Sequence, residues 1–150
     1  MRELIAVRSQ FGPAPDVPIR GEIHRGDAYS RAGRYSEAVD AATRALDLAR
    51  DHGLRGYEAW ALYSLGEVQS RAIPLKTEAA KDAYEAGRSL AHELEMRPLE
   101  AMCALGLGTL SALISERHDA RAELTAASAA FRGMGMQFWL EKAESALKSF

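Results

Sequence analysis

The chain is short of several features that would narrow its function at once. It has a single cysteine, Cys103, so it cannot form a disulfide within the chain, which argues against a disulfide-stapled secreted scaffold and fits a reducing cytoplasm. It has no run of 18 apolar residues, so the sequence offers no membrane span. Ile and Val together number nine against 28 alanines, a balance that disfavours strands and predicts helices throughout.

An excess of charge of one sign is missing too. The 19 basic and 21 acidic residues are interspersed and leave a net charge of −2. No basic block is present, so nothing supports nucleic-acid binding through phosphates. The first seven residues hold one Arg and a short apolar run interrupted by Glu3, which does not predict a secretory leader. We therefore expect a cytoplasmic protein that binds neither nucleic acid nor membrane.

What the chain does contain is a repeat. Residues of the same kind recur 40 or 42 positions apart: Gly26, Gly66 and Gly108; Ala38, Ala80 and Ala120; Leu54, Met96 and Met136. A period of this length predicts a stack of small helical units rather than one globular core. Stacks of this kind are usually surfaces for binding other proteins.

Seven helices are predicted from the three- and four-residue spacing of apolar side chains and from Gly and Pro between them. They cover about residues 19–32, 35–51, 57–71, 77–94, 98–114, 117–132 and 138–148. The first six form antiparallel pairs in units of about 18–54, 55–96 and 97–135, and the seventh caps the stack over 136–150. Residues 1–17 are predicted to be a lead-in segment, extended around Phe11–Pro15. The expected fold is all-α, a right-handed α-solenoid of three helix pairs with a C-terminal capping helix in 18–150.

The small and aromatic residues of these units resemble the tetratricopeptide (TPR) repeat. In that pattern Leu-Gly lies on the first helix of a pair, and Ala recurs on the second at four- and three-residue steps. The three units supply Gly26, Tyr29, Gly33, Tyr35, Ala38, Ala42 and Ala45; Leu65, Gly66, Ala80, Tyr84 and Gly87; and Leu107, Gly108, Ala120, Leu124 and Ala127. The resemblance implies that the helices of a pair nearly touch where Gly and Ala face each other.

The sequence departs from the pattern in three places. Glu22 and Arg25 stand where large apolar residues are expected, the turn of the second unit is two residues longer, and Ser115 replaces a turn glycine. The period also exceeds the usual 34 residues. Units of about 40 residues are similar to the C-terminal TPR arrays of large bacterial signalling proteins, which carry nucleotide-cyclase or LuxR-type DNA-binding domains ahead of the array.

The sequence carries no recognisable catalytic, cofactor or metal motif. Residues 106–111, Gly-Leu-Gly-Thr-Leu-Ser, superficially match a dinucleotide fingerprint but lie inside a predicted helix, where tight packing explains the glycines. The four histidines fall at separate places without metal-ligand spacing. No Ser, His and Asp set is suggested. The expectation is a protein that is not an enzyme, with no cofactor and no metal, and an unrecognised active site is the least favoured alternative.

The remaining candidate site is the concave groove that the first helices of the pairs line in a TPR stack. By register its residues are Arg20, Ile23, Asp27, Ser30, Arg31, Trp60, Tyr63, Glu67, Ser70, Arg71, Met102, Leu105, Thr109 and Leu113. Trp60 could instead pack against a neighbouring helix, and the sequence does not decide between the two. Apolar contacts would come from Trp60, Tyr63, Met102 and Leu105, and orientation from the charged members. The positions that form the carboxylate clamp of chaperone-binding TPR proteins hold Ile23, Asp27, Ser64, Met102 and Gly106, so that chemistry is not expected.

The sequence therefore predicts a protein-interaction module that docks a peptide or partner helix in the concave groove, in bacterial cytoplasmic signalling or regulation. The alternative is a homo-oligomer in which Leu4–Val7, or the cap residues Phe138 and Trp139, cover a neighbouring copy.

Overall fold

The computed structural model describes residue 14 and residues 16–149, and this part of the chain is helical with no strand. Its helices are α2 (Asp16–Arg31), α3 (Tyr35–Asp51), α4 (Arg55–Arg71), α5 (Thr77–Glu93), α6 (Arg97–Leu113), α7 (Arg117–Met134) and α8 (Gln137–Leu147). Most of the predicted lead-in segment, including Leu4–Val7, lies outside the described residues. No described helix combines the length and the apolar character needed to cross a membrane.

The predicted helix boundaries hold to within three residues, and the largest difference is at the first helix. α2 begins at Asp16, inside the segment that was expected to precede the repeats. Pro18 belongs to the cluster of prolines that predicts this segment, yet it is the third residue of the helix. The first turn of a helix leaves its backbone N–H groups without intrahelical acceptors, so a proline there removes no hydrogen bond.

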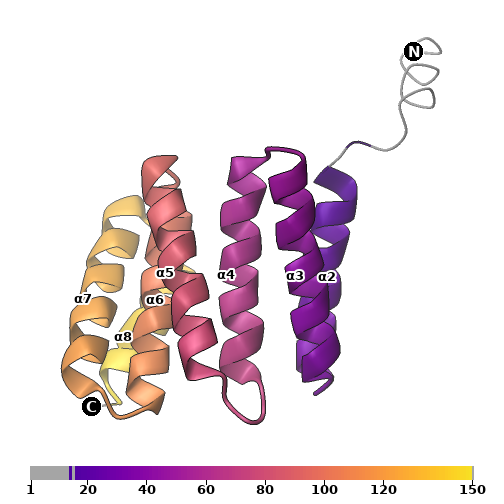
Figure 1. The fold of residues 1–150 in the computed structure, drawn as a ribbon. Coiled ribbons are helices and arrows are strands. Elements are labelled where there is room, and N and C mark those ends of the chain that lie inside the picture. The colour runs from indigo at the N-terminus through magenta and orange to yellow at the C-terminus, as the bar shows by residue number, and fades with distance from the viewer. Residues whose placement is uncertain (1–13, 15, 150) are drawn as a thin grey trace.

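The helices stand side by side in an antiparallel row (Figure 1) and form two layers. In the layer of even-numbered helices, α2 has Cα atoms within 8 Å of α4, α4 of α6, and α6 of α8. In the described chain, no such approach joins α3 to α5 or α5 to α7. The row therefore curves with the even-numbered helices on its inner side. We call α2, α4, α6 and α8 the inner row, and α3, α5 and α7 the outer row.

Small residues allow the close approach within each pair, as the resemblance implied. A Cβ atom added to Gly26 of α2 would lie 3.3 Å from the Ala38 carbonyl oxygen of α3. One added to Gly108 of α6 would lie 2.7 Å from Leu124 Cγ of α7. Interiors packed this densely leave no room for a larger side chain at these points. The recurring glycines are thus contacts between helices.

Five of the six connections between the described helices contain a residue with a left-handed backbone. Gly33, Gly53 and Gly135 have φ values of 77°, 63° and 68°, as expected for glycines that end helices. Glu95 and Ser115 adopt φ values of 57° and 66° at the matching positions of other units. The turn geometry of the repeat is therefore kept even where the sequence has lost the glycine.

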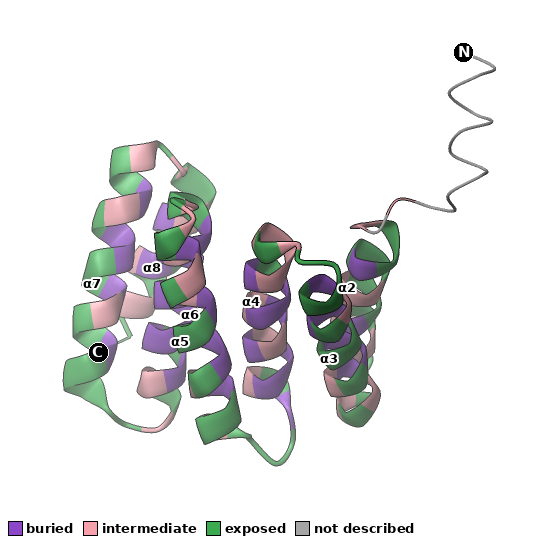
Figure 2. Ribbon diagram, turned by 45° about the horizontal axis from the view of Figure 1, so that its top comes forward, coloured by how far each residue is buried: buried purple, intermediate pink, exposed green. Residues whose placement is uncertain are grey.

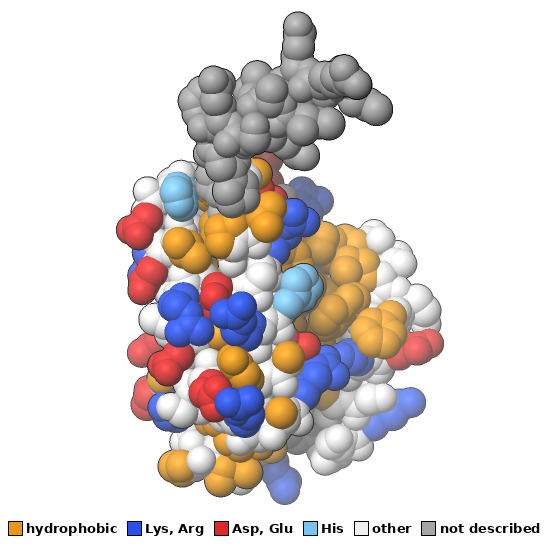
Figure 3. Space-filling view, turned by 90° about the vertical axis from the view of Figure 1, so that its right-hand side faces the viewer, with side chains coloured by type: hydrophobic (Ala, Val, Ile, Leu, Met, Phe, Trp, Pro, Cys, Tyr) orange, Lys and Arg blue, Asp and Glu red, His pale blue; other side chains and the backbone are white. Residues whose placement is uncertain are grey.

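The buried faces of the helices point toward their neighbours in the row (Figure 2), while the two ends of the row differ. At the first end Glu22 of α2 pairs with Arg25 at 3.0 Å and with Arg44 of α3 at 3.2 Å. Charged side chains of both signs cover this end (Figure 3). At the other end α8 packs on α7 and α6. α8 thus closes the row as the predicted cap.

Candidate functional site

The inner row encloses an open cavity of about 660 Å³ on its concave side, and we call this cavity the inner groove. It runs from α2 across α4 and α6 to α8, and one side chain of the outer row reaches it from α5. Its lining includes all but two of the predicted site residues: Ile23, Asp27, Arg31, Trp60, Tyr63, Glu67, Ser70, Arg71, Met102, Leu105, Thr109 and Leu113. On the side of the inner row, at the right of Figure 3, hydrophobic side chains gather with Lys and Arg side chains beside them.

Two predicted residues do not line the inner groove. Ser30 is buried, and the other is Arg20. Its guanidinium lies 3.2 Å from the Asp16 carboxylate one turn earlier on α2. Because α2 begins three residues before the predicted start, Asp16 is helical and stands at the i, i+4 spacing that favours such a pair. This ion pair holds the Arg20 side chain along α2, so it does not line the groove.

Trp60 lies in the inner groove and not in the core, which decides between its two sequence-based interpretations. Its side chain is 38% exposed, and its ring meets Tyr63 edge to face with the centroids 6.1 Å apart. Tyr63 in turn lies 6.1 Å from the ring of Tyr84, a residue of α5. Three aromatic rings therefore form a continuous wall from the open mouth of the groove down to its floor.

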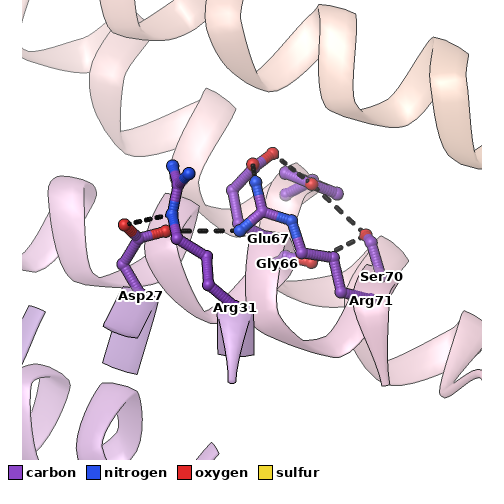
Figure 4. A network of polar contacts seen from close by, with 7 residues as sticks. Asp27, Arg31, Gly66, Glu67, Ser70 and Arg71 are labelled. Carbon is purple, nitrogen blue, oxygen red and sulfur yellow. Dashed lines mark hydrogen bonds and ion pairs between the residues drawn. The ribbon is translucent and has the colours of Figure 1, made fainter. Parts of the chain in front are cut away.

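A chain of charges crosses the groove between α2 and α4 (Figure 4). Asp27 accepts from Arg31 Nε at 2.9 Å and from Arg71 Nη1 at 3.3 Å. The second nitrogen of the Arg71 fork, Nη2, donates to Glu67 at 3.2 Å. One guanidinium thus bridges two carboxylates that belong to different helices. A lysine could not take its place, because an ammonium lacks the planar fork of N–H donors.

Tyr84 connects this chain of charges to the outer row. Its hydroxyl donates to Glu67 Oε1 at 2.6 Å, and Ser70 Oγ lies 3.2 Å from the same hydroxyl. Ser70 has one proton to donate, and its shorter contact is to the Gly66 carbonyl at 2.7 Å. The Glu67 carboxylate is therefore held from two sides, by Arg71 and by Tyr84.

Two glycines let the Tyr84 ring pass between α4 and α6. A Cβ atom added to Gly66 would lie 2.7 Å from Tyr84 Cδ1, and one added to Gly106 would come closer still to Tyr84 Cε1. Both approaches are shorter than any real carbon–carbon contact of this kind, so the ring fits only against glycine on each side. Gly106, which resembled part of a dinucleotide motif, is a packing contact.

The two tyrosines of the groove stay protonated over the physiological range. Burial raises the pKa of Tyr84 far above its usual value of about 10, and the nearby Glu67 carboxylate raises it further. The pKa of Tyr63 is raised for the same two reasons. Both hydroxyls are consequently neutral groups, and that of Tyr84 is a permanent donor to Glu67.

The half of the groove formed by α6 and α8 is apolar apart from one cation. Met102, Leu105 and Leu113 of α6 line it together with Trp139 of α8. Lys142 of α8 also lines it, and its ammonium lies 5.0 Å from the ring centroids of both Trp139 and Phe138. The hydroxyl of Thr109 is satisfied by the Leu105 carbonyl at 2.9 Å, so it contributes little polarity here.

The repeat register did not predict five of the polar and aromatic lining residues: His24, Ser64, Tyr84, Trp139 and Lys142. One of them, Lys142, could have been found by continuing the 40-residue spacing into the cap, because it follows Met102 by one such step. Trp139 follows Leu99, which is buried in the core, so the spacing alone would not have placed it in the groove. Tyr84 is one of the residues that carry the TPR resemblance, but its reach into the groove depends on two glycines from other helices.

In the described chain, the groove offers neither a group of metal ligands nor an ionised thiol. Among the described residues, no three or more His, Cys, Asp or Glu side chains are grouped so that they could hold a metal ion. Cys103 is buried behind the groove, and that burial raises its pKa to about 12, so it remains a thiol. No family model matches the chain, and no curated protein matches it.

Proposed function

We propose that this chain is a non-catalytic protein-interaction module of the TPR type, which binds a peptide or partner helix in the inner groove. The observation that carries the proposal is the groove itself. Four successive helices of the inner row present aromatic, apolar and charged side chains to one continuous concave surface. In globular proteins such side chains are normally dispersed over the surface or buried in the core.

The composition of the groove suits protein recognition. Aromatic and arginine side chains dominate the binding energy of protein interfaces, and here they are Trp60, Tyr63, Trp139, Arg31 and Arg71. Tyr63 and Trp60 hold each other in place, so little conformational entropy remains to be lost when a partner binds. The buried inner end of the aromatic wall gives the groove a rigid floor.

The cellular setting that we propose is bacterial cytoplasmic signalling or regulation. Its support is the period of 40 to 42 residues, which resembles the TPR arrays of multidomain signalling proteins. In that setting the groove would dock a segment of a regulatory partner, or of another domain of the same assembly.

The test is a pair of substitutions at exposed apolar side chains, one inside the groove and one outside it, measured against one partner. A partner captured from the native host is purified, and its affinity is measured by calorimetry for the wild type and for Trp60→Ala. We expect a loss of about 2 kcal/mol, roughly thirtyfold in Kd, because Trp60 is a central aromatic contact. Leu75→Ala is the matched control, since Leu75 is a large apolar residue of nearly the same exposure (39%) that does not line the groove. Equal affinities for the wild type and Trp60→Ala, with helicity intact, would show the groove assignment to be wrong.

Self-association is a second candidate, and the exposure of Phe138 at the end of the row favours it. A second copy could cover that ring on α8. Light scattering over a range of concentrations should then show a dimer that Phe138→Ala dissociates. A mass that stays monomeric at every concentration would remove this candidate.

A further inference from the structure

The charges that line the inner groove do not balance, and this imbalance limits the kind of partner that fits. Two acidic residues, Asp27 and Glu67, face three that are permanently basic, Arg31, Arg71 and Lys142. Both carboxylates are already paired with the groove's own arginines. Glu67 also accepts the Tyr84 hydroxyl. The α2–α4 half of the groove is therefore internally neutralised.

Lys142 is in a different position. In the described part of the chain it forms no ion pair, and its ammonium instead meets the faces of two aromatic rings. Those rings fix the place of the ammonium at the edge of the apolar half, beside Trp139. A cation held over aromatic rings keeps its charge available to a further partner, because the rings supply no anion. The Lys142 side chain also loses little conformational freedom when an anion binds, because the two rings already hold it in place.

Resting on the proposed function, we propose that the occupant of the inner groove is an acidic amphipathic protein segment. Its large apolar side chains fill the space between Trp60, Met102 and Leu105, and an Asp or Glu carboxylate of the segment pairs with Lys142. An anion is directed to Lys142 and not to the arginines, since binding at Arg71 would displace two carboxylates that it already holds. The contact also fixes the direction in which the segment lies, with its acidic residue toward α8.

Selection of peptides from a random library displayed on phage tests this assignment with the full chain as bait. The wild type should enrich peptides that combine large apolar residues with Asp or Glu. The Lys142→Glu variant should lose the preference for Asp and Glu. The control Lys148→Glu should keep it, because Lys148 is exposed just after the end of the same helix and does not line the groove.

A peptide from the wild-type selection then provides the quantity to be measured. Lys142→Ala should weaken its binding about two- to fivefold, as expected for a solvent-accessible ion pair. Changing the acidic residue of the peptide to its amide should cost the wild type the same factor. Lys142→Ala should add no further loss with the amide peptide, because the two changes remove one shared contact. Raised salt should shrink the difference.

The outcomes separate this inference from the proposed function. Two results would overturn the pairing with Lys142. One is that the wild type selects basic peptides, and the other is that the Lys142→Glu variant still enriches peptides with Asp or Glu. If the same peptides lose affinity for Trp60→Ala, the groove remains the binding site and only its charge preference is wrong. Peptides that bind Trp60→Ala as tightly as the wild type would overturn the proposed function, and the inference with it.

Discussion

The two halves of the inner groove are built from the same positions of the repeat and yet have opposite chemistry. Asp27 of α2 and Glu67 of α4 correspond to Thr109 of α6, and Arg31 and Arg71 correspond to Leu113, at spacings of 40 and 42 residues. In the α2–α4 half these positions form a connected set of ion pairs. In the α6–α8 half they join Met102, Leu105 and Trp139 in an apolar surface.

The comparison separates what the repeat fixes from what it leaves open. Gly and Ala recur because neighbouring helices touch there, and a larger side chain would not fit. The groove positions lie one helix face away and meet no such limit, so their chemistry can differ from unit to unit. Under the proposed function, selectivity would arise from the order of charged and apolar units along the row while the fold stays the same.

The largest expected effect comes from the junction of the two halves, at Gly106. Gly106→Ala should lower the free energy of unfolding by about 1–3 kcal/mol, because its Cβ would collide with the buried ring of Tyr84. Gly21→Ala is the control, since that position in α2 has open space around it and alanine there should stabilise by about 0.5–1 kcal/mol. Urea denaturation measures both. Opposite signs are expected, and a shared sign would show that the Tyr84 ring does not fill the junction between the halves.

Alkaline pH should destabilise the same junction. The folded-state pKa values of Tyr63 and Tyr84 lie far above the unfolded value of about 10. The unfolded chain therefore loses these protons first as the pH rises, so the free energy of unfolding falls above about pH 10. Below about pH 10 the two tyrosines make a contribution that does not change with pH. The slope approaches about 1.4 kcal/mol per pH unit for each tyrosine. Tyr84→Phe should remove its share of the slope, and an unchanged slope would contradict the burial of this hydroxyl.

At neutral pH, Tyr84→Phe isolates the hydrogen bond between the outer row and the charged half. We expect a loss of about 1 kcal/mol in the free energy of unfolding, because Glu67 keeps Arg71 and some solvent contact after losing its second donor. Tyr57→Phe is the matched control. The Tyr57 hydroxyl meets Asp16 at 3.3 Å, a longer contact, so the loss there should be smaller. Equal losses would mean that Tyr84 contributes only its ring.

The smallest effect is expected for the outermost ion pair of the charged half. Arg31 is 72% exposed, and Arg31→Ala should change the free energy of unfolding by less than about 0.5 kcal/mol. Arg71→Ala should cost more, roughly 0.5–1 kcal/mol, because two carboxylates then lose their shared partner. Thermal unfolding at low and high salt measures both. A larger effect for Arg31 than for Arg71 would show that the shared guanidinium does not hold the charged half together.

The sequence was sufficient for the fold because its signals are local and repeated. Helical spacing of Ala and Leu, with Gly or Pro at the ends, placed every described helix to within three residues. The same register placed all of the predicted groove residues on the inner groove except Arg20 and Ser30. The register failed at Arg20 because α2 begins three residues earlier than predicted, which lets Arg20 pair with Asp16. Pro18, in the first turn of α2, had been assigned to the segment before the helix.

The rest of the site depends on contacts between units, which a register cannot show. The contact of Tyr84 with Glu67 requires that Gly66 and Gly106, from two different helices, open a passage between them. Lys142 was overlooked because α8 was expected to cover the stack and not to form a further unit of its wall. The binding of a partner in the groove stays a prediction, because it depends on a second molecule.

The ring of Tyr84 is also a spacer. It fills the gap between two inner helices while belonging to the outer row, so its thickness sets how far apart α4 and α6 stand. The width of the groove is therefore set by a residue whose backbone belongs to the outer row. A thinner side chain at this position would let the two helices close up and would narrow the groove, without altering any residue of the inner row. The width of the groove and the identity of its lining residues are separately adjustable in this architecture.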